Sequence, residues 1–361
     1  MRQLCTRGFE PIIALHGDGP VAELAAQAGV DAYRSSVSNL VGTQHPARQS
    51  FDIVRSLRRS RTELERRGIS LVHTNDARLH RLWGPAARSA GRGWIWHQRT
   101  PGLSRGMTLL ARTADEIITV STYAHSSLPG MIRGRSHIID NPFQELDSSS
   151  LPNVRSQILA SVPGGQPPFV VGLISNLKVP RKRPDTFIRI AGRLNEEGVQ
   201  AAYPVVGELR PDRLRKLEDI AESAGCRDRI IFAGSQTPAS AWIAACDVVI
   251  APAVDEAFGR VLVEAAMLGV PVVAADDGGH REIIDDGRTG FLFAPDDIRI
   301  AAQATRRLLT DRCLRDRIAA AASAAARRRF SVDTHADRVT ELYAEVLNRR
   351  PSARQVTSTP S

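Results

Sequence analysis

The stretch of sequence that decides the fold reads Asp247-Val248-Val249-Ile250, then Asp255-Glu256-Ala257-Phe258-Gly259-Arg260-Val261-Leu262-Val263-Glu264-Ala265-Ala266, then Val270-Pro271-Val272-Val273-Ala274. The two short apolar runs predict buried strands, and the segment that begins at Gly259 predicts a helix between them. Strand, helix and strand in this order form the repeating unit of a parallel sheet that is covered by helices.

The same alternation extends from this stretch toward the amino terminus. Apolar runs predict buried strands at 11–15, 70–73, 94–97, 116–120, 169–174, 202–206 and 229–232, and amphipathic runs predict helices at 51–67, 79–90, 185–197 and 214–224. We therefore expect an α/β protein built from two successive Rossmann-like, doubly wound parallel-sheet domains.

The length of the chain also indicates two domains. A chain of 361 residues is longer than a single hydrophobic core usually supports. A polar run at 147–150 and a Pro- and Gly-rich run at 163–168 separate the two series of strands. The expected organisation is a first domain at 1–150, a linker at 151–168, a second domain at 169–335, a helix at 336–350 that packs back on the first domain, and a disordered tail at 351–361.

The candidate site follows the strand at 247–250. Because Gly259 opens a helix, the unpaired backbone N–H groups around it favour a bound phosphate. Glu256, in the loop, and Glu264, just inside the helix, lean toward the same side, and their carboxylates suit the hydroxyls of a sugar. The pattern predicts a ligand with phosphate in its middle and sugars at both ends. The alternative is that Glu256 only complements the helix dipole and Glu264 lies on an exposed helix face.

At this point the sequence resembles a family, the retaining GT-B glycosyltransferases of the family 4 type, which use nucleotide-sugar donors. The resemblance lies in the glutamate pair Glu256 and Glu264, followed in order by Gly269-Val270-Pro271-Val272-Val273-Ala274, Gly278-Gly279-His280-Arg281-Glu282-Ile283-Ile284 and Asp286-Gly287-Arg288-Thr289-Gly290-Phe291-Leu292. It implies the GT-B fold, with a cleft between two Rossmann-like domains.

The resemblance also implies roles for individual residues. Glu256 would contact the transferred sugar and Glu264 the ribose hydroxyls, with backbone amides of Phe258 and Gly259 near the diphosphate. Arg260 and Gly207 complete the donor-binding set that we expect.

A basic loop in the second domain is expected to oppose the leaving diphosphate. Lys182, just before the helix at 185–197, matches the family's lysine, and a compact ammonium suits the charge that develops on a departing diphosphate. The arginine usual in the family is replaced by Leu173, so its role passes to Lys178 or Arg181. The alternative is a solvated basic loop.

In the first domain the resemblance runs through Leu71-Val72-His73-Thr74-Asn75, Trp96-His97, Ala114 to Ser121, and Asp140-Asn141-Pro142-Phe143. His97 matches a histidine that lies near the donor sugar in some members, so we expect a catalytic role for it. A structural hydrogen-bonding role is the alternative, and it is the favoured one for His73. For His280 the functional and the structural role are both open, and it ranks between His97 and His73 as a candidate.

The beginning of the sequence departs from the family. Members usually start with a strand, a Gly-Gly loop and a long helix before the segment that corresponds to Arg7–Leu15 here. We expect that the start of the chain is set too late; the alternative is that the first domain lacks this element.

Composition limits the partners of the protein. The formal net charge is +9, but only three of the 48 Lys and Arg residues are lysines, so the number of arginines is a weak functional signal. Most of the excess charge lies in residues 1–150, where either solvated arginine faces or an anionic membrane surface would account for it. With 5% aromatic residues and dispersed arginines, nucleic-acid binding is not expected.

Location and metal content follow from what the sequence does not display. No apolar run is long enough for a spanning helix, and the first residues lack the core of a signal peptide, so we expect a cytoplasmic protein, peripheral to the inner face of the membrane at most. Four widely spaced cysteines fit neither a disulfide framework nor a zinc site. No Asp-x-Asp motif is present, so we expect neither a metal nor a cofactor besides the nucleotide-sugar substrate.

The sequence therefore predicts a glycosyltransferase that moves a sugar from a nucleotide diphosphate sugar to a hydroxyl of a glycan, polysaccharide or lipid-linked acceptor, with retention of configuration. Two rivals stay open. One is a non-catalytic or partner-dependent nucleotide-sugar binder, and the other is a sugar-nucleotide epimerase of the same fold. A nicotinamide-dependent dehydrogenase is a distant third, because no Gly-x-Gly-x-x-Gly follows a predicted strand.

Overall fold

The computed structural model describes residues 1–17, 19–35, 37, 46–163, 165 and 167–350. The predicted tail at 351–361 lies outside them. The chain forms two compact units: residues Met1–Asn141 together with Val332–Ser361, and residues Pro142–Ser331. Each predicted strand is present, with its ends shifted by at most two residues.

The second unit is built on a six-stranded parallel sheet in the order β12-β11-β10-β7-β8-β9. Its strands are β7 (Phe169–Ile174), β8 (Ala201–Val206), β9 (Ile230–Gly234), β10 (Val248–Ala251), β11 (Val272–Ala275) and β12 (Phe291–Phe293). Since β7 lies inside the sheet and the chain proceeds outward from it in both directions, the unit is doubly wound. This strand order is that of the Rossmann fold.

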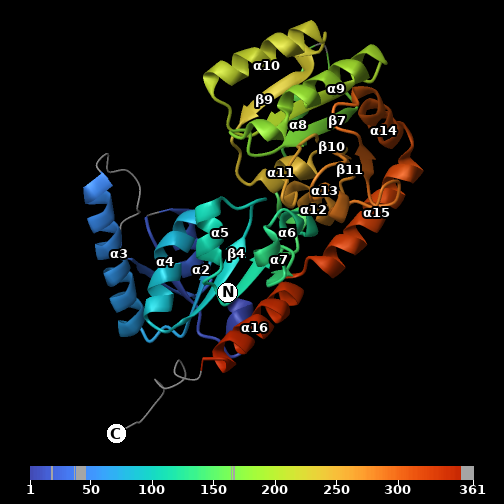
Figure 1. Ribbon diagram of the computed structural model, residues 1–361. Helices are drawn as coiled ribbons and strands as arrows, with labels where there is room; N and C mark the ends of the chain where they lie inside the picture. The colour runs from blue at the N-terminus through green and yellow to red at the C-terminus, as the bar shows by residue number, and fades with distance from the viewer. Residues whose placement is uncertain (18, 36, 38–45, 164, 166, 351–361) are drawn as a thin grey trace. The chain divides into compact units, whose positions relative to one another are not determined.

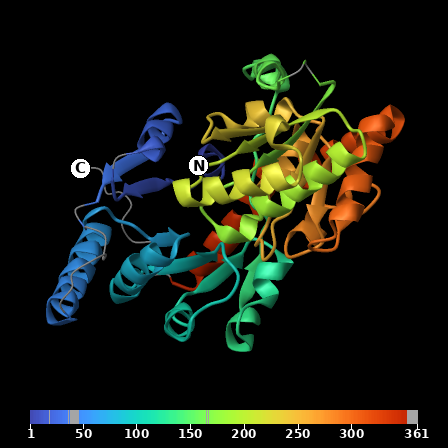
Figure 2. The same cartoon turned by 90° about the horizontal axis from the view of Figure 1, so that it is seen from above.

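Helices cover both faces of this sheet (Figure 1). One face is covered by α9 (Pro184–Glu196), α10 (Pro211–Ser223), α14 (Ile298–Thr310) and α15 (Arg312–Arg329), and the other by α8 (Arg155–Ala160), α11 (Ala239–Ala244) and α12 (Arg260–Met267); α13 (His280–Ile283) follows β11. Figure 2 shows α9 and α10 lying side by side. Two separate apolar clusters result, one on each face of the sheet.

Prolines explain why several helices begin earlier than the hydrophobic pattern predicted. Pro184 and Pro211 occupy the first positions of α9 and α10. A proline fits there because its missing N–H has no helical acceptor in any case. The periodicity of apolar residues begins later than the backbone turn that the proline starts.

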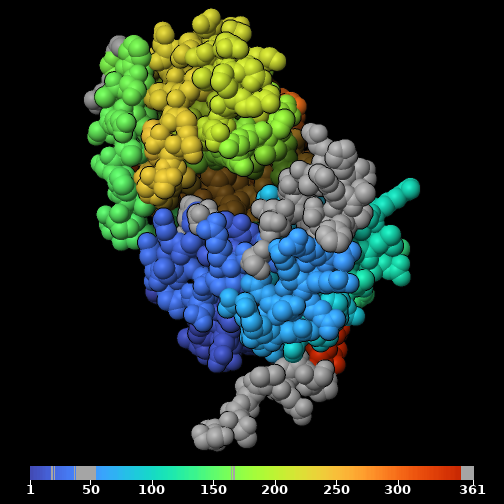
Figure 3. All heavy atoms as spheres, turned by 90° about the vertical axis from the view of Figure 1, so that its left-hand side faces the viewer, coloured from blue at the N-terminus to red at the C-terminus, as the bar shows by residue number. Residues whose placement is uncertain are grey.

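The first unit contains two parallel sheets. The larger has the order β3-β4-β5-β6, and β1 pairs with β2 in a second, two-stranded sheet. These strands are β1 (Ile12–Leu15), β2 (Asp31–Arg34), β3 (Leu71–Thr74), β4 (Gly93–Gln98), β5 (Glu116–Thr119) and β6 (Ser136–Ile138). The helices are α1 (Arg2–Cys5), α2 (Pro20–Gln27), α3 (Pro46–Arg66), α4 (Ala77–Ser89), α5 (Arg105–Ala111), α6 (Thr122–Ser126), α7 (Gly130–Arg133) and α16 (Val332–Asn348). Figure 3 shows α3, in light blue, on the outer surface of this unit.

The core of the first unit lies on both sides of the central strand β4, all of whose residues are buried. Successive side chains of a strand point to opposite faces. Trp94 and Trp96 pack with α4 and α5 on one face, and Ile95 packs with α16 on the other. The carboxyl-terminal helix is therefore part of the core of the first unit.

The boundaries between the units differ from the predicted ones. The structure divides the chain after Asn141 and again after Ser331, rather than at 150 and 335. Part of the predicted linker at 151–168 belongs to the second unit, because Ile158 of α8 and Val162 are buried against β7 and β8. Their few apolar side chains lie on one side of a short helix, which a count of composition does not detect.

Candidate functional site

The site predicted from the sequence lies where the strand order of the second unit reverses. The neighbouring strands β7 and β10 continue into loops at 175–183 and 252–259, and the chain moves from them to opposite sides of the sheet. Side chains cannot fill the crevice that such a divergence leaves outside the carboxyl ends of the strands, so ligands bind there in open α/β sheets. Lys182 lies in the first of these loops and Glu256 in the second.

The loop that carries Glu256 is fixed by its backbone. The N–H of Val254 donates to the carbonyl oxygen of Arg181 over 3.0 Å, and the N–H of Gly279 donates to the carbonyl oxygen of Glu256 over 2.8 Å. The N–H of Asp255 donates to a carboxylate oxygen of Asp277 over 2.5 Å, and Asp255 has a φ of 51°. A non-glycine residue in this conformation costs free energy that the surrounding bonds must supply, so the loop is held in one shape.

Two glycines allow a neighbouring loop to reach this backbone. A Cβ on Gly279 would lie 2.7 Å from Cα of Phe258, and one on Gly278 would lie 2.5 Å from the carbonyl oxygen of Glu256. Real Cβ atoms do not approach backbone so closely. The Gly278-Gly279 pair is therefore required for the packing that fixes Glu256.

Lys182 and Glu256 form an ion pair through the ammonium and Oε2. The side chains are 16% and 14% exposed, so both charges are largely removed from water while remaining accessible to a ligand. An ion pair with this burial is stabilised by mutual neutralisation, and removing either partner leaves an uncompensated charge.

The N-terminus of α12 lies next to this pair. Gly259 caps the helix with a φ of 98°, and a Cβ there would lie 2.9 Å from the ring of His280. His280 is buried and donates from Nδ1 to the carbonyl oxygen of Ala275 over 3.1 Å. Burial lowers the pKa of His280, so the ring beside Gly259 is neutral at pH 7. The positive end of the helix dipole is the fixed charge at this position.

Glu264 lies little more than one turn into α12 and pairs with Arg260 over 3.2 Å. Burial raises the pKa of Glu264, and the Arg260 guanidinium offsets part of that effect. The Glu264 side chain is 24% exposed, so its carboxylate retains a route to a ligand. The alternative of an exposed helix face does not describe it.

Phe258 has a structural role in addition to the predicted backbone role. Its ring packs against Phe330 with centroids 5.5 Å apart and against Phe143 at 6.1 Å. The N–H of Phe143 donates to the carbonyl oxygen of Phe330 over 2.9 Å, and Arg260 stacks on the Phe143 ring at 4.6 Å. The loop that carries Glu256 and Phe258 is thus packed against both segments by which the chain enters and leaves the second unit.

The other predicted residues of the second unit lie around this site without joining the ion pair. Lys178 pairs with Glu208 over 2.7 Å, and both side chains are more than half exposed. Nε of Arg181 is buried and has no hydrogen-bond partner among the residues that the structure describes. Gly207 has a φ of 148°, and a Cβ there would lie 2.1 Å from the carbonyl oxygen of Ser175, so this position requires glycine for close packing behind the loop.

His97 lies in the first unit, at the carboxyl end of β4, and is 5% exposed. Its Nδ1 is 3.1 Å from Nε2 of His73. Its Nε2 is buried without a partner among the residues that the structure describes. Sequence reasoning selected His97, ranked His73 below it, and missed Tyr343, whose hydroxyl lies 2.6 Å from Nδ1 of His73. No local signal could have found Tyr343, because it lies on the far end of the chain.

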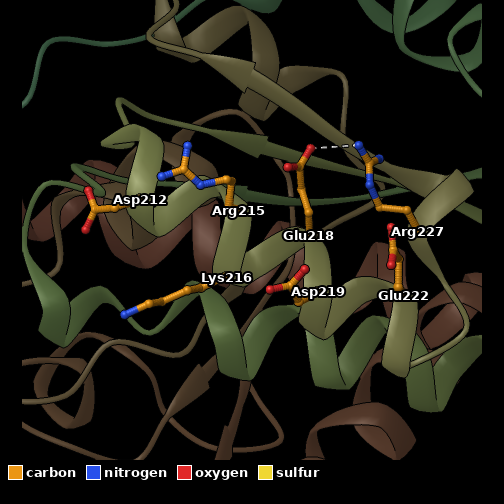
Figure 4. Close-up of a pocket in the computed structure, with 7 residues that line it drawn as sticks. All are labelled: Asp212, Arg215, Lys216, Glu218, Asp219, Glu222 and Arg227. Atoms are coloured by element: carbon orange, nitrogen blue, oxygen red, sulfur yellow. Dashed lines mark hydrogen bonds and ion pairs between the residues drawn. The ribbon is translucent and has the colours of Figure 1, made fainter.

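A separate cavity of about 500 Å³ lies on the surface of the second unit at α10. Figure 4 shows its charged lining, with a dashed line between Glu218 and Arg227, which pair over 2.9 Å. It contains none of the predicted site residues, and its lining consists of charges of both signs: Asp212, Arg215, Lys216, Glu218, Asp219, Glu222 and Arg227. Such a mixed, open surface lacks the apolar walls of a small-molecule site.

Comparison with known proteins agrees with the fold and with the second unit. Residues 166–325 match the family described as Glycosyl transferases group 1. The chain is 36% identical over 173 residues to D-inositol 3-phosphate glycosyltransferase of Xylanimonas cellulosilytica. The matched region covers 47% of this chain and 41% of that protein. It is 33% identical over 137 residues to the lipopolysaccharide core biosynthesis mannosyltransferase LpsB of Rhizobium meliloti, covering 37% of this chain and 38% of that one.

The similarity of fold extends over nearly the whole chain. The structure of Anabaena HepE in complex with UDP and glucose matches with a TM-score of 0.75 at 23% identity, covering 95% of each chain. The predicted α/β fold with two Rossmann-like domains is confirmed, and it is the GT-B fold. The sequence match reaches only about two fifths of the length of the two curated relatives. Together, the group 1 match and the neighbouring folds support a GT-B glycosyltransferase.

Proposed function

We propose that the protein transfers a sugar from a nucleotide diphosphate sugar to a hydroxyl acceptor, with retention of anomeric configuration. The observation that carries the proposal is the Lys182–Glu256 ion pair beside the N-terminus of α12, at the reversal of strand order. This combination offers a cation and a helix dipole to a diphosphate, and carboxylates to the sugars on either side of it.

In the proposed reaction the bond between the anomeric carbon and the diphosphate oxygen breaks, and the electron pair leaves with the diphosphate. Lys182 stabilises that charge as it develops, together with the N-terminus of α12. The acceptor oxygen bonds to the anomeric carbon from the face that the leaving group vacates, and its proton passes to a phosphate oxygen. Transfer through an oxocarbenium-like state on one face gives retention.

The two glutamates have different tasks in this proposal. Glu256 accepts hydrogen bonds from the transferred sugar. Its partner Lys182 turns to the diphosphate, whose negative charge then takes the place of the Glu256 carboxylate beside the ammonium. Glu264 accepts hydrogen bonds from the ribose hydroxyls. Burial raises the pKa of Glu264, so this carboxylate becomes protonated at a higher pH than an ordinary carboxyl group does. Recognition of the ribose therefore weakens as the pH falls through that range.

The acceptor that we propose is a glycan, polysaccharide or lipid-linked hydroxyl, reached at the cytoplasmic face of an anionic membrane, and no metal takes part. Among the described residues, no helix is both long and apolar enough to cross a bilayer. Transfer that persists in a chelator would support metal independence, and sedimentation with vesicles that contain anionic lipid would test the membrane surface.

A donor panel tests the proposal directly. UDP, GDP, ADP and their sugar conjugates are added to the wild type and to Glu264→Ala, and unfolding temperature and nucleotide release are measured. UDP-glucose comes first, since the HepE crystal holds UDP and glucose. A ligand at about 100 times its Kd stabilises by about 2.7 kcal/mol, which is a shift of a few degrees. A shift with one nucleotide, weakened in the variant, is expected; no response to any nucleotide in folded protein would refute a donor site.

The product distinguishes transfer from the rival activities. Transfer yields a glycoside whose anomeric proton, observed by NMR, has the configuration of the donor. An epimerase converts the donor without an acceptor, and a binding protein gives the thermal shift without any product.

A further inference from the structure

Three aromatic side chains with polar atoms form a hydrogen-bonded chain inside the first unit. His73 and Ile95 face one another in the register of β3 and β4, and His97 follows Ile95 by two residues. Since strand side chains alternate between faces, His73 and His97 project from the same face as Ile95. That face is covered by α16, which places Tyr343 next to His73, at one end of the row of hydrogen bonds.

The distances define the order of this chain. The Tyr343 hydroxyl lies 2.6 Å from Nδ1 of His73, and Nε2 of His73 lies 3.1 Å from Nδ1 of His97. Tyr343 is 8% exposed and His97 is 5% exposed. Nε2 of His97 ends the chain as a buried nitrogen with no partner among the described residues.

All the imidazoles near His97 are neutral at pH 7. Burial is the main cause that lowers the pKa of His73, to about 4, and it lowers the pKa of His97 well below the ordinary value. His335 stacks on His97 with centroids 6.4 Å apart, and burial lowers its pKa as well. The Arg99 guanidinium adds positive charge nearby, which acts in the same direction.

A neutral imidazole has one N–H donor and one acceptor nitrogen, so the direction of the chain is set at its tyrosine end. The hydroxyl of Tyr343 has no acceptor but Nδ1 of His73 among the residues that the structure describes. A buried hydroxyl proton without an acceptor is unfavourable, because it has lost its hydrogen bond to water. Tyr343 therefore donates to His73, which leaves the His73 proton on Nε2, where it donates to Nδ1 of His97. The proton of His97 must then lie on Nε2.

We propose that Tyr343 and His73 are positioning residues that fix His97 as the tautomer protonated at Nε2, so that this N–H donates to an acceptor oxygen of the bound ligand. The unpartnered nitrogen needs a hydrogen-bond acceptor, and a sugar hydroxyl oxygen or a phosphate oxygen supplies one. The identification of the ligand as a sugar nucleotide rests on the proposed function, whereas the direction of the chain does not.

The tautomer is tested by NMR of protein labelled with ¹⁵N at its nine histidines. Two-bond proton–nitrogen correlations show which ring nitrogen bears the proton, and a His97→Gln variant assigns the signals. The expected result is His97 with its proton on Nε2 in the wild type and a mixture of tautomers in Tyr343→Phe. Tyr33→Phe, which removes a hydroxyl elsewhere in the same unit, should leave His97 unchanged.

A second pair of variants keeps the test decisive should Tyr343→Phe fold poorly. In His73→Gln the side-chain amide retains a donor for His97, and in His73→Leu it does not. His73→Gln should keep the proton of His97 on Nε2, and His73→Leu should lose that preference. A proton on Nδ1 of His97 in the wild type, or a tautomer that none of these variants alters, overturns the proposal.

The ligand is tested by kinetics with the sugar nucleotide that gives the largest thermal shift. Tyr343→Phe and His73→Leu should each lower kcat/KM about tenfold, His73→Gln should restore most of the loss, and Tyr33→Phe should retain wild-type values. Unchanged kcat/KM in variants whose tautomer has changed overturns the ligand assignment. Absence of any response to sugar nucleotides refutes the proposed function, while the NMR result is unaffected by it.

Discussion

The two units of this protein hold polar groups in opposite ways. In the second unit, Lys182 and Glu256 form an ion pair whose side chains are 16% and 14% exposed, and the loop backbone around them is fixed by hydrogen bonds. In the first unit, His73 and His97 are neutral, and side-chain hydrogen bonds from Tyr343 to His73 and from His73 to His97 orient their rings.

The difference concerns what each region presents to a ligand. A charged pair can exchange one partner for a phosphate, which suits a site where charge moves during a reaction. A neutral chain offers a single N–H in a fixed direction, which suits recognition of an oxygen without adding charge. The first arrangement is sensitive to removal of either charge, and the second to removal of any link.

The largest expected effect is at the ion pair. Lys182→Ala and Glu256→Gln should each lower the rate of sugar transfer by about 10²–10³, which is the loss typical of removing one group that stabilises developing charge. The measurement is nucleotide release with the preferred donor. Lys216→Ala, an exposed lysine on α10, is the matched control and should behave as the wild type. Equal rates in Lys182→Ala and Lys216→Ala would exclude the assigned role of the pair.

The second largest effect is expected at the packing that fixes the loop of Glu256. Gly279→Ala forces a Cβ to 2.7 Å from the Phe258 backbone, so we expect a destabilisation of about 1–3 kcal/mol, as is usual when a packed region must accept an extra methyl group. Hydrogen exchange in peptides that cover 254–262 should accelerate.

The control for this variant is Gly106→Ala. Gly106 lies in α5 with nothing within 4 Å of a Cβ, so alanine should be neutral or stabilising there. If Gly279→Ala were as stable as the wild type, the close approach would have no energetic importance.

The pH dependence of the first unit tests its neutral histidines. The pKa of His73 in the folded protein, about 4, lies below its ordinary value of 6.5. The unfolded chain therefore binds more protons between these values, and stability must fall as the pH is lowered through this window. We expect the unfolding temperature of the first unit to drop by several degrees between pH 7 and pH 5.

Tryptophan fluorescence can follow the first unit alone. Trp83, Trp94 and Trp96 are buried in it, and Trp242→Phe removes the tryptophan of the second unit. His73→Gln should reduce the dependence, since glutamine does not titrate, while His80 and His97, whose pKa values burial also lowers, retain part of it. A first unit whose stability is constant from pH 7 to pH 5 would contradict neutral burial of these rings.

The smallest effect is expected at the exposed member of the basic loop. Lys178 pairs with Glu208 and is more than half exposed, and an ion pair of this kind contributes about 0–1 kcal/mol. Lys178→Ala should therefore weaken donor binding by no more than about fivefold, measured by calorimetry, whereas Lys182→Ala should weaken it by more than tenfold. A larger loss of donor binding in Lys178→Ala than in Lys182→Ala would assign the phosphate contact to Lys178 instead.

Much of the second unit was predictable because its determinants are local. The run 247–274 contains strand, loop, helix and strand, and each follows from the hydrophobic period and from glycine at the turns. The pairing of Lys182 with Glu256 was not visible in the sequence, since 74 positions separate them. It arises because β7 and β10 are neighbours in the sheet.

In the first unit the sequence predicted strands, the helices at 51–67 and 79–90, and a carboxyl-terminal helix at 336–350 that packs on this unit, but not the contacts that these elements make. The strands at 70–73 and 94–97 follow from apolar runs, but nothing near them indicates which of their faces α16 covers or that Tyr343 reaches His73. In the second unit, the burial of Ile158 and Val162 was likewise not predicted, because the composition of their segment indicated a linker.

The sequence by itself determined the alternation of strands and helices, the fold class, and the residues of the glutamate loop, because these depend on the spacing of apolar residues and on backbone preferences within one segment. Only the tertiary structure decided which cation meets Glu256, which glycines permit that loop to pack, and which hydroxyl ends the histidine chain. Those contacts join segments up to 270 positions apart. They depend on strand order and helix packing, which the whole chain decides together.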